Sequence, residues 1–361
     1  MRALERRLKE IAIRAIGGLS SGYKLDFRDI NIDSVKRILL VKQHDQLGDL
    51  LLFSPVLPAV RNRFPNAYIA VCTRGYTKDV VLEDPLVDDV LVIHRRLGNW
   101  RVRDLACAAR CLVLGFDLAI VFNTISHSFT SDMVTLLGRA RYRIGPTEPT
   151  FPRVKKNAFY NIEVSIPRER MQMSEMYLSI AEPLGVSIGE VKERMYVGRE
   201  WEDEAASALE SWGVKRDDKL FAIHPGGARD YARWPLERYS ELGDRLSLLP
   251  NARIVMIVGR GESWGEDVAR QMKAEPIICK ATKLKLLAAI FKHVQVYVGN
   301  DTGLFHVAAS VGTKAVGIYG KTNPDVWKPK GSHVIAVRSG DMDVNSIKVE
   351  EVYSAVMGLL Q

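Results

Sequence analysis

Four stretches of the sequence combine glycine with acidic, cationic or histidine side chains directly after an apolar run. They read KQHDQLGDLLLFSP, HPGGARDYARWP, IVGRGESWGED and GNDTGLFHVAA. Glycine lets backbone N–H groups approach an anion closely, arginine binds phosphate oxygens, and a carboxylate can accept a proton. These residue types therefore suit the binding of a phosphate or another anion at the ends of strands.

The stretch HPGGARDYARWP has the pattern of a phosphate-binding loop. Gly226 and Gly227 keep the chain out of regular structure and let backbone amides approach a ligand. Arg229 and Arg233 add cationic groups whose geometry suits phosphate oxygens. The alternative is a surface turn with solvated arginines, which we favour less because glycines and arginines converge on one strand end.

The stretch GNDTG lies where an apolar run ends and a helix is predicted to begin near Leu304. Asp301 and Thr302 can cap the helix, and Gly303 lets a ligand lie close to its free N–H groups, which attract anions. His306 follows about one turn inside the helix, where a packing role is the alternative to a functional one. The stretch therefore predicts an anion site at a strand end.

Two carboxylates on the remaining stretches leave two interpretations open. Gly48 allows a tight turn before Asp49, and Asp49 either caps the following helix or presents a free carboxylate. Glu262 lies where an acidic residue accepts hydrogen bonds from ribose hydroxyls; alternatively, it is an exposed glutamate favoured by the helix dipole. The full GxGxxG fingerprint is missing there, so the spacing alone does not decide.

Strand-to-helix corners must hold these stretches, and the sequence predicts two series of them. Apolar runs that alternate with helical patterns read RILLVKQ, AYIAVC, DDVLVIH and FDLAIVF, then KLFAIHPGG, ARIVMIVG, EPIICK, VQVYVGND and KAVGIYG. This alternation predicts an α/β fold with two Rossmann-like halves. We expect a basic N-terminal extension over residues 1–30, an N-terminal domain over 31–190 and a C-terminal domain over 191–361. Ligands of such sheets bind at the carboxyl ends of the strands, where the four stretches lie.

The composition fits a globular protein of a reducing compartment. The chain has 361 residues, 47% of them hydrophobic and 26% charged, and this length favours two domains. The four cysteines show neither metal-binding nor disulfide spacing. No apolar run reaches the roughly 18 residues of a membrane-spanning helix, and no signal peptide is recognisable. We therefore expect a cytoplasmic protein.

The first twenty residues, MRALERRLKEIAIRAIGGLS, predict a basic amphipathic helix. This helix either packs on the protein or a partner, or adsorbs to an anionic membrane surface, where each Lys or Arg adds about 1 kcal/mol. The formal net charge of +8 fits an acidic or phosphorylated partner. Nucleic acid is not expected, because no reading module accompanies the charge.

The stretch GNDTGLFHVAASVGTKAVGIYGKTNPDVWKP resembles the signature of glycosyltransferase family nine, the bacterial heptosyltransferases that build the lipopolysaccharide inner core. Three further stretches resemble the family in the right order: HDQLGDLLLFSPVLPAVRNRFPNAYIAV, HPGG followed by RWP, and TKLKLLAAIFKHVQVYVGND. Together the matches cover most of the chain from about Arg37 to Pro329. Four ordered matches are far more specific than any one of them.

The resemblance implies a GT-B fold, in which two Rossmann-like domains face each other across a cleft. It also implies an inverting transfer of a heptose from ADP-heptose to a lipopolysaccharide-core glycolipid, with Asp49 as the general base. Neither a metal nor another cofactor is implied, and the acidic DMD segment at residues 341–343 is interpreted as a solvated loop. The positions that match the family's donor site are Gly226, Gly227, Glu262, Asp301, Thr302, Gly303 and His306.

The sequence departs from the family pattern in the second loop. Members commonly carry a lysine shortly before the RWP-like segment, where this chain has Ala232. Arg233 or Arg229 would have to supply the missing positive charge, so the identity of the donor sugar stays an expectation. The N-terminal extension would bring the enzyme to the inner membrane, where lipid-linked acceptors lie.

For the acceptor, basic side chains of the N-terminal half suit phosphates or sugar carboxylates, although each of them can equally be a solvated surface arginine. These candidates are Arg61, Arg63, Arg101, Arg103, Arg141 and Arg143. Two other classes of function also fit the pattern. One is a nucleotide-sugar-binding protein without transferase activity, and the other is a GT-B nucleotide-sugar epimerase.

Overall fold

The structure is a computed structural model. It describes residues 24–43, 46–94, 100–124, 128–147, 159–166, 171–186, 191–227, 230–259, 261–280 and 283–361. The predicted N-terminal amphipathic helix and Arg229 lie outside these described residues. The chain divides into two units, Met1–Gln46 with Phe53–Val191 and Leu47–Leu52 with Lys192–Gln361.

The first unit is built on a six-stranded parallel sheet in the order β3-β2-β1-β4-β5-β6. Its strands are β1 (Arg37–Val41), β2 (Tyr68–Arg74), β3 (Asp89–Ile93), β4 (Leu118–Val121), β5 (Tyr142–Pro146) and β6 (Ile162–Val164). Its helices are α3 (Val56–Arg63), α4 (Val102–Leu114), α5 (Phe129–Leu137) and α6 (Met173–Ala181), with short 3₁₀ turns at Phe27–Asp29, Ile32–Ser34, Lys78–Val80 and Glu182–Leu184.

The second unit repeats this architecture with the strand order β12-β11-β10-β7-β8-β9, again all parallel. Its strands are β7 (Lys219–His224), β8 (Ala252–Val258), β9 (Ile277–Lys280), β10 (Val294–Asn300), β11 (Lys314–Tyr319) and β12 (Val334–Arg338). Its helices are α7 (Arg199–Ser211), α8 (Leu236–Ser247), α9 (Trp264–Gln271), α10 (Leu284–Phe291), α11 (Gly303–Ser310), α12 (Pro324–Trp327) and α13 (Val349–Leu360), with 3₁₀ turns at Asp230–Ala232 and Val344–Ser346.

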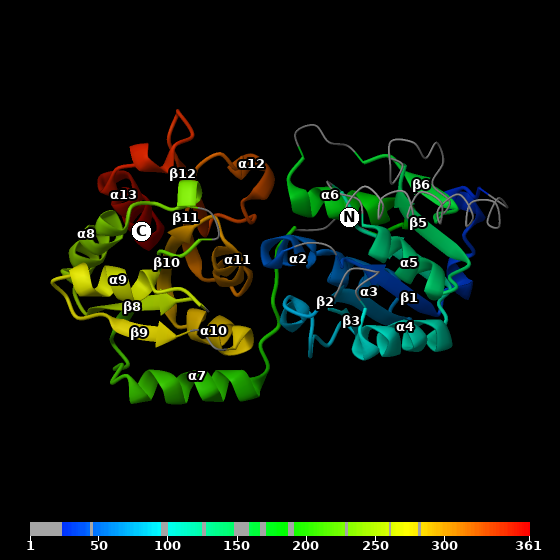
Figure 1. Cartoon of the computed structure of the whole chain (residues 1–361), viewed down its shortest axis with the longest axis horizontal. Helices are drawn as coiled ribbons and strands as arrows, with labels where there is room; N and C mark the ends of the chain where they lie inside the picture. Colours follow the sequence, from blue (N-terminus) through cyan, green and yellow to red (C-terminus); the bar gives the residue numbers. More distant parts are fainter. Residues whose placement is uncertain are drawn as a thin grey trace. The chain divides into compact units, whose positions relative to one another are not determined.

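Helices cover both faces of each sheet (Figure 1), which explains why the central strands are apolar along their whole length. In β1 every residue from Ile38 to Val41 is buried, and in β10 only Gln295 is exposed. The four cysteines are free thiols. None of the helices that the structure describes has the length and hydropathy of a membrane-spanning segment.

All nine strands predicted from the sequence are confirmed, and three more complete the two sheets. The additional strands are β5, β6 and β12, each at or next to a sheet edge. Helix α2 (Leu47–Phe53) follows β1 along the chain, yet Leu47–Leu52 belongs to the second unit by its contacts. The glycine–aspartate stretch therefore joins the C-terminal half of the chain, whereas the sequence assigned it to the N-terminal domain.

Candidate functional site

Two of the sequence-predicted corners meet at the centre of the second sheet. Strand β7 leads into HPGG, β10 leads into GNDTG, and the two strands are hydrogen-bonded neighbours, with Gly299 paired to His224. The chain leaves β7 toward β8 and leaves β10 toward β11, which lie on opposite sides. Strand order thus reverses between β7 and β10, and ligands of open parallel sheets bind at such a point.

Asn300 links these two corners by hydrogen bonds. Its Nδ2 donates to the carbonyl oxygens of Pro225 and Gly226, both at 3.0 Å, and its Oδ1 accepts from the Trp234 N–H at 3.0 Å. The side chain is 1% exposed, so these bonds are shielded from water. Sequence reasoning missed Asn300, although it stands inside the quoted GNDTG stretch.

The amino end of α11 lies beside the HPGG loop. Thr302 occupies the N-cap position, but its buried side chain makes no capping hydrogen bond and interacts with the Tyr297 hydroxyl. A Cβ placed on Gly227 would lie 3.7 Å from Asn300 Nδ2 and 3.9 Å from Thr302 Cγ2. Free helix N–H groups, a hydroxyl and a glycine backbone thus converge where an anion is favoured.

Glu262 is held by His224 and by two glycines. Its Oε1 lies 3.0 Å from His224 Nε2 and accepts a hydrogen bond of 2.9 Å from the Gly259 N–H. A Cβ on Gly226 or Gly259 would lie 2.2 or 2.1 Å from this oxygen, so a side chain at either position would displace the carboxylate. The carboxylate therefore lies directly against the HPGG loop.

The same contacts keep Glu262 ionised. Burial alone would raise the pKa of Glu262, but the hydrogen bond and charge of His224, the Gly259 N–H and the charge of Arg233 together hold this pKa below its ordinary value. An ionised carboxylate only accepts hydrogen bonds, as a ribose contact requires. His224 was not singled out in the sequence, although it begins the HPGG stretch.

His306 lies buried within α11 and contacts the glycine–aspartate stretch. Its Nε2 lies 3.7 Å from Asp301 Oδ1, and a Cβ placed on Gly48 would lie 2.9 Å from its Cδ2. A Cβ placed on Gly303 would lie 2.8 Å from Leu47 Cδ2. Helix α2 therefore packs directly on α11, and glycines make this close approach possible.

This packing corrects one sequence prediction and places Asp49. Gly48 lies inside helix α2 and does not form the expected tight turn; its missing side chain makes room for the His306 ring. Asp49 is half-buried in the first turn of α2, one residue after this contact. The proposed base and the GNDTG corner thus belong to the same structural unit.

Arg233 is held at the HPGG loop by three contacts. Its guanidinium stacks on the Trp264 ring, 3.9 Å from the centroid, and its Nη2 donates to the Gly227 carbonyl at 3.5 Å and pairs with Asp230. Its buried Nε has no hydrogen-bond partner. Arg233 therefore brings a positive charge to the loop, next to the 3₁₀ turn that contains Ala232.

Buried polar atoms without hydrogen-bond partners accumulate in this part of the second unit. Such atoms are uncommon in folded proteins and call for an explanation, of which a ligand is one. In the described part of the second unit they include His224 Nδ1, Arg233 Nε, Tyr239 OH and His306 Nδ1.

Two of the arginines predicted to bind the acceptor stabilise the start of strands in the first unit. Arg61 donates to the carbonyls of Ala67 at 2.6 Å and Leu86 at 3.0 Å, just before β2 and β3. Arg143 donates to the carbonyls of Ala140 at 2.9 Å and Phe159 at 2.8 Å. Both guanidinium groups are thus used within the fold.

Two further candidate arginines lie at the same edge. Arg63, at the end of α3, donates to the Leu184 carbonyl at 2.9 Å, and Arg141 precedes β5 with its guanidinium 5.2 Å from the Tyr142 ring centroid. These four of the six candidate arginines therefore lie at the amino-terminal edge of the first sheet, whereas Arg101 and Arg103 lie at the start of α4. This placement argues against an acceptor role, because ligands bind at the opposite edge.

The carboxyl edge of the first sheet carries polar side chains that the sequence analysis missed. Lys42, directly after β1, is buried, and its Nζ donates to the Phe122 carbonyl at 3.1 Å and to the Tyr177 hydroxyl at 2.8 Å. Asn123 follows the neighbouring strand β4, is 4% exposed, and has no hydrogen-bond partner at Oδ1 or Nδ2. Since strand order reverses between β1 and β4, Asn123 is a second candidate contact for a polar ligand.

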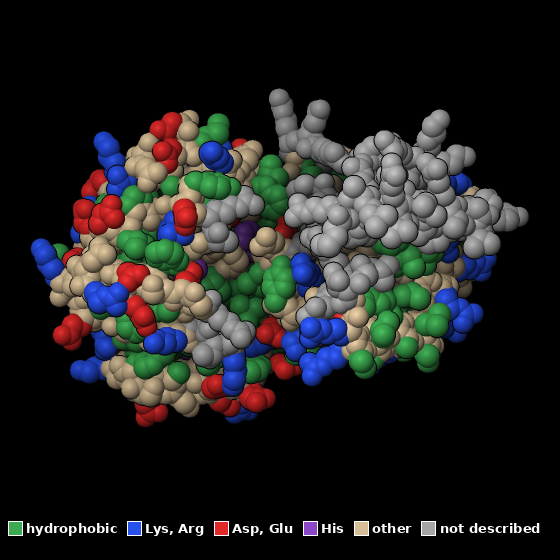
Figure 2. Space-filling view, viewed as in Figure 1, with side chains coloured by type: hydrophobic (Ala, Val, Ile, Leu, Met, Phe, Trp, Pro, Cys, Tyr) green, Lys and Arg blue, Asp and Glu red, His purple; other side chains and the backbone are tan. Residues whose placement is uncertain are grey.

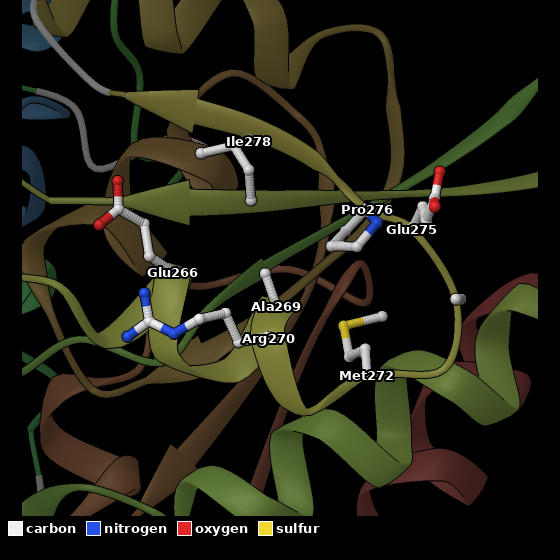
Figure 3. A pocket seen from close by; sticks show the side chains of 8 residues that line it. Glu266, Ala269, Arg270, Met272, Glu275, Pro276 and Ile278 are labelled. Carbon is white, nitrogen blue, oxygen red and sulfur yellow. The ribbon is translucent and has the colours of Figure 1, made fainter.

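Two other features do not belong to this site. A surface hollow runs along α9, from Glu266 in the IVGRGESWGED stretch to the start of β9, and is also lined by Arg270 and Met272 among others (Figure 3). In the DMD segment, Asp341 accepts hydrogen bonds from the Ser339 hydroxyl at 2.6 Å and the Asp343 N–H at 3.0 Å, which lower its pKa to about 2. These bonds hold a turn together, as the loop interpretation predicted.

Within the described ranges no cluster of acidic, histidine and cysteine side chains is arranged to hold a metal ion.

Comparison with known proteins identifies the family. The family model of glycosyltransferase family 9 (heptosyltransferase) matches residues 110–355. Lipopolysaccharide heptosyltransferase 3 of Escherichia coli (strain K12) is 24% identical over 306 residues, which cover 81% of this chain and 86% of the relative. Lipopolysaccharide heptosyltransferase 2 of the same strain is 22% identical over 317 residues, covering 83% and 87%.

Solved structures agree in fold. A family 9 glycosyltransferase from Veillonella parvula is 23% identical, with a TM-score of 0.80 and coverage of 90% of this chain and 97% of that one. The E. coli ADP-heptose lipopolysaccharide heptosyltransferase II is 18% identical, with a TM-score of 0.73 and coverage of 90% and 98%. The chain belongs to glycosyltransferase family 9, with the α/β GT-B fold of its members, and is therefore a glycosyltransferase.

Proposed function

We propose that the protein transfers a heptose from ADP-heptose to the core of a lipopolysaccharide or a related glycolipid, with Asp49 as the general base. One observation carries this proposal: HPGG, GNDTG and the start of α2, which bears Asp49, all belong to one unit of a family 9 fold. The relatives are named as lipopolysaccharide heptosyltransferases, and one solved neighbour is an E. coli heptosyltransferase with ADP-2-deoxy-2-fluoro heptose.

The donor diphosphate is proposed to bind at the amino end of α11. Thr302 Oγ1 and the helix N–H groups would donate to its oxygens, and the helix dipole would stabilise the charge that grows on the departing nucleoside diphosphate. Glu262, kept ionised by His224, would accept hydrogen bonds from the ribose hydroxyls. Arg233 would supply the positive charge that a lysine provides in other members of the family.

Asp49 is proposed to take the proton of the attacking acceptor hydroxyl. Its position supports this role, because it lies one residue from the contact between Gly48 and His306, and His306 in turn lies near Asp301. A single displacement at the anomeric carbon would invert its configuration.

The acceptor is proposed to contact the carboxyl edge of the first sheet. Asn123 carries both a donor and an acceptor without partners, which suits a sugar hydroxyl. This residue replaces the four arginines at the opposite edge as the leading candidate. Association with the inner membrane through the N-terminal helix remains part of the proposal, and that helix lies outside the described residues.

Replacing Asp49 by asparagine tests the reaction. We expect transfer to a lipopolysaccharide-core acceptor to fall by about 100-fold or more, the range for loss of a general base. Binding of ADP-heptose, measured by calorimetry, should change by less than about threefold, because the shape of the side chain is kept. The exposed carboxylate Asp217 offers the control variant Asp217→Asn, which should transfer normally.

Three results would contradict the proposal. Normal transfer by Asp49→Asn would remove Asp49 from the mechanism. Donor binding without turnover by the wild type would indicate a nucleotide-sugar-binding protein. Release of free sugar from the donor in the absence of any acceptor would indicate an epimerase.

A further inference from the structure

Helix α4 of the first unit is apolar on two opposite faces, of which only one packs on the sheet. Asp104, Ala108 and Cys111 form its buried side. On the other side Val102 is 81% exposed, Leu105 56%, Leu112 44% and Val113 84%. Figure 2 shows hydrophobic side chains gathered over the position of α4 in Figure 1, with Lys and Arg beside them.

The exposed side forms one continuous apolar stripe along the helix. Successive residues of a helix are about 100° apart around its axis, and six residues of α4 fall within an arc of about 120°. In order around the axis they are Leu112, Leu105, Ala109, Val102, Val113 and Ala106. Arg103 and Arg110 lie just beyond one margin of this arc, and Arg101 just beyond the other. We call these nine residues the α4 outer face.

The charge on the α4 outer face is only positive. The helix contains a single acidic residue, Asp104, which is 1% exposed and accepts hydrogen bonds from the backbone N–H groups of His94 at 2.7 Å and Arg101 at 3.1 Å. Of the three arginines, Arg110 pairs with Asp89 at 2.9 Å, and its side chain remains 59% exposed. An apolar stripe with arginines on both margins is thus presented to solvent.

We propose that the α4 outer face docks on an anionic lipid bilayer, with α4 lying flat in the headgroup region. Its thirteen residues span about 20 Å, and such a helix inserts its apolar side while arginines at the margins reach anionic headgroups. This surface is independent of the predicted N-terminal helix, and it deepens the proposed membrane association.

The charge pattern favours a bilayer over a second copy of the chain. In a two-fold dimer the same face would meet itself, so arginines would oppose arginines across the apolar stripe. Anionic headgroups, in contrast, carry the charge opposite to that of all three arginines. The α4 outer face lies on the first unit, whereas the predicted donor site lies on the second, so membrane binding and sugar transfer can be measured separately.

The test is sedimentation of the full-length protein with vesicles, without any sugar ligand. Wild type is expected to bind phosphatidylcholine vesicles that contain phosphatidylglycerol, and to bind pure phosphatidylcholine weakly. Leu105→Glu combined with Val113→Glu should lower the partition coefficient at least about tenfold. The control is Leu248→Glu, which introduces one of the two charges at an apolar residue of the second unit that is 84% exposed, and it should bind like wild type.

The arginine contribution is tested by Arg103→Ala, which should weaken binding to the anionic vesicles by about fivefold and leave binding to the neutral ones unchanged. Its control is Arg199→Ala, at a side chain that is 93% exposed on α7. Because all substituted side chains are exposed, circular dichroism and melting curves should match those of wild type.

Two outcomes would overturn the proposal. Unchanged vesicle binding by the Leu105→Glu, Val113→Glu variant would assign membrane binding to another part of the chain. A wild-type dimer in light scattering that this variant converts to a monomer would assign the α4 outer face to a second copy. Neither outcome bears on sugar transfer, which the Asp49 variant tests.

Discussion

At the scale of single residues, the pair of His224 and Glu262 shows how the fold prepares a charged group. Glu262 Oε1 contacts His224 Nε2 and the Gly259 N–H at 3.0 and 2.9 Å, and two glycines leave it room. These contacts offset the cost of burying the carboxylate and keep it ionised. A ribose contact at this position would therefore meet an acceptor already oriented by the protein.

The lowered pKa of Glu262 predicts how the contribution of the His224–Glu262 pair to the stability of the fold depends on pH. Because the pKa in the folded state lies below the ordinary value of 4.5, the ionised group stabilises the fold above about that pH, and this contribution is lost as the pH falls through the lowered pKa. Glu262→Gln should lower the free energy of unfolding by about 1 kcal/mol near neutral pH. The difference in the free energy of unfolding between wild type and Glu262→Gln should become smaller when the pH falls below the ordinary pKa of a glutamate.

Urea unfolding curves at neutral and acidic pH measure this difference. The control variant is Glu210→Gln, at an exposed glutamate of α7, which should show no comparable pH dependence. A difference between wild type and Glu262→Gln that stays constant with pH would show that the charge of Glu262 does not stabilise the fold.

Asn123 carries the residue-scale prediction for the acceptor. Its buried amide has no hydrogen-bond partner among the described residues, so replacing it by alanine removes hydrogen bonds to a ligand and none to that part of the protein. We expect Asn123→Ala to raise the KM for the acceptor about fivefold to tenfold and to leave ADP-heptose affinity unchanged. Steady-state kinetics with the acceptor varied would measure this, and an unchanged KM would place the acceptor elsewhere.

At the scale of secondary-structure elements, the contact between α2 and α11 joins the proposed base to the proposed phosphate site. The two helices approach closely because Gly48 and Gly303 have no side chains where His306 and Leu47 lie. The order of the elements along the chain conceals this pairing, since α2 follows the first strand of the other unit.

The prediction for this contact is a coupling between Gly48 and His306. Gly48→Ala places a methyl group 2.9 Å from the His306 ring, which should shift α2 and lower transfer about tenfold, while the better helix propensity of alanine, worth about 1 kcal/mol, limits the loss of stability. In a His306→Ala background the same substitution should cost much less, because the ring is gone.

A double-mutant cycle on kcat/KM measures this coupling. Purely additive effects of the two substitutions would show that the Gly48–His306 contact does not position Asp49. Gly358→Ala, in helix α13 with open space around the added Cβ, serves as the control and should leave transfer unchanged.

At the scale of the whole molecule, two parallel sheets each provide a reversal of strand order with polar groups at its carboxyl edge. Around the reversal in the second unit lie backbone N–H groups, Thr302, Glu262 and Arg233, while the one in the first unit has Lys42 and Asn123. This difference in chemistry supports the proposal that the donor binds at the second sheet and the acceptor at the first.

The whole-molecule prediction concerns the choice of nucleotide. A ligand that binds only the folded state stabilises it by about 2.7 kcal/mol at a hundredfold excess over its Kd. We therefore expect ADP and ADP-heptose to raise the melting temperature by a few degrees, and GDP and UDP to have smaller effects. Equal shifts with all three nucleotides, measured by differential scanning fluorimetry, would contradict an adenine-specific donor site.

Local patterns in the sequence were sufficient for the class of fold. Nine apolar strands were correctly located, because burial on both faces of a parallel sheet leaves a continuous apolar run. The strands β5, β6 and β12 were missed. They lie at or beside the sheet edges, and β6 has only three residues.

Only the tertiary structure decided which side chains contact one another at the candidate site. These partners are residues far apart in the chain. They include the contacts of Asn300 and His224, the packing of Gly48 on His306, and the contacts of four arginines at the amino-terminal edge of the first sheet. A spacing rule describes only neighbours along one element, whereas these contacts arise where parallel strands bring their carboxyl ends together. For the same physical reason, the exposure of the α4 outer face became visible only once the opposite face had packed on its sheet.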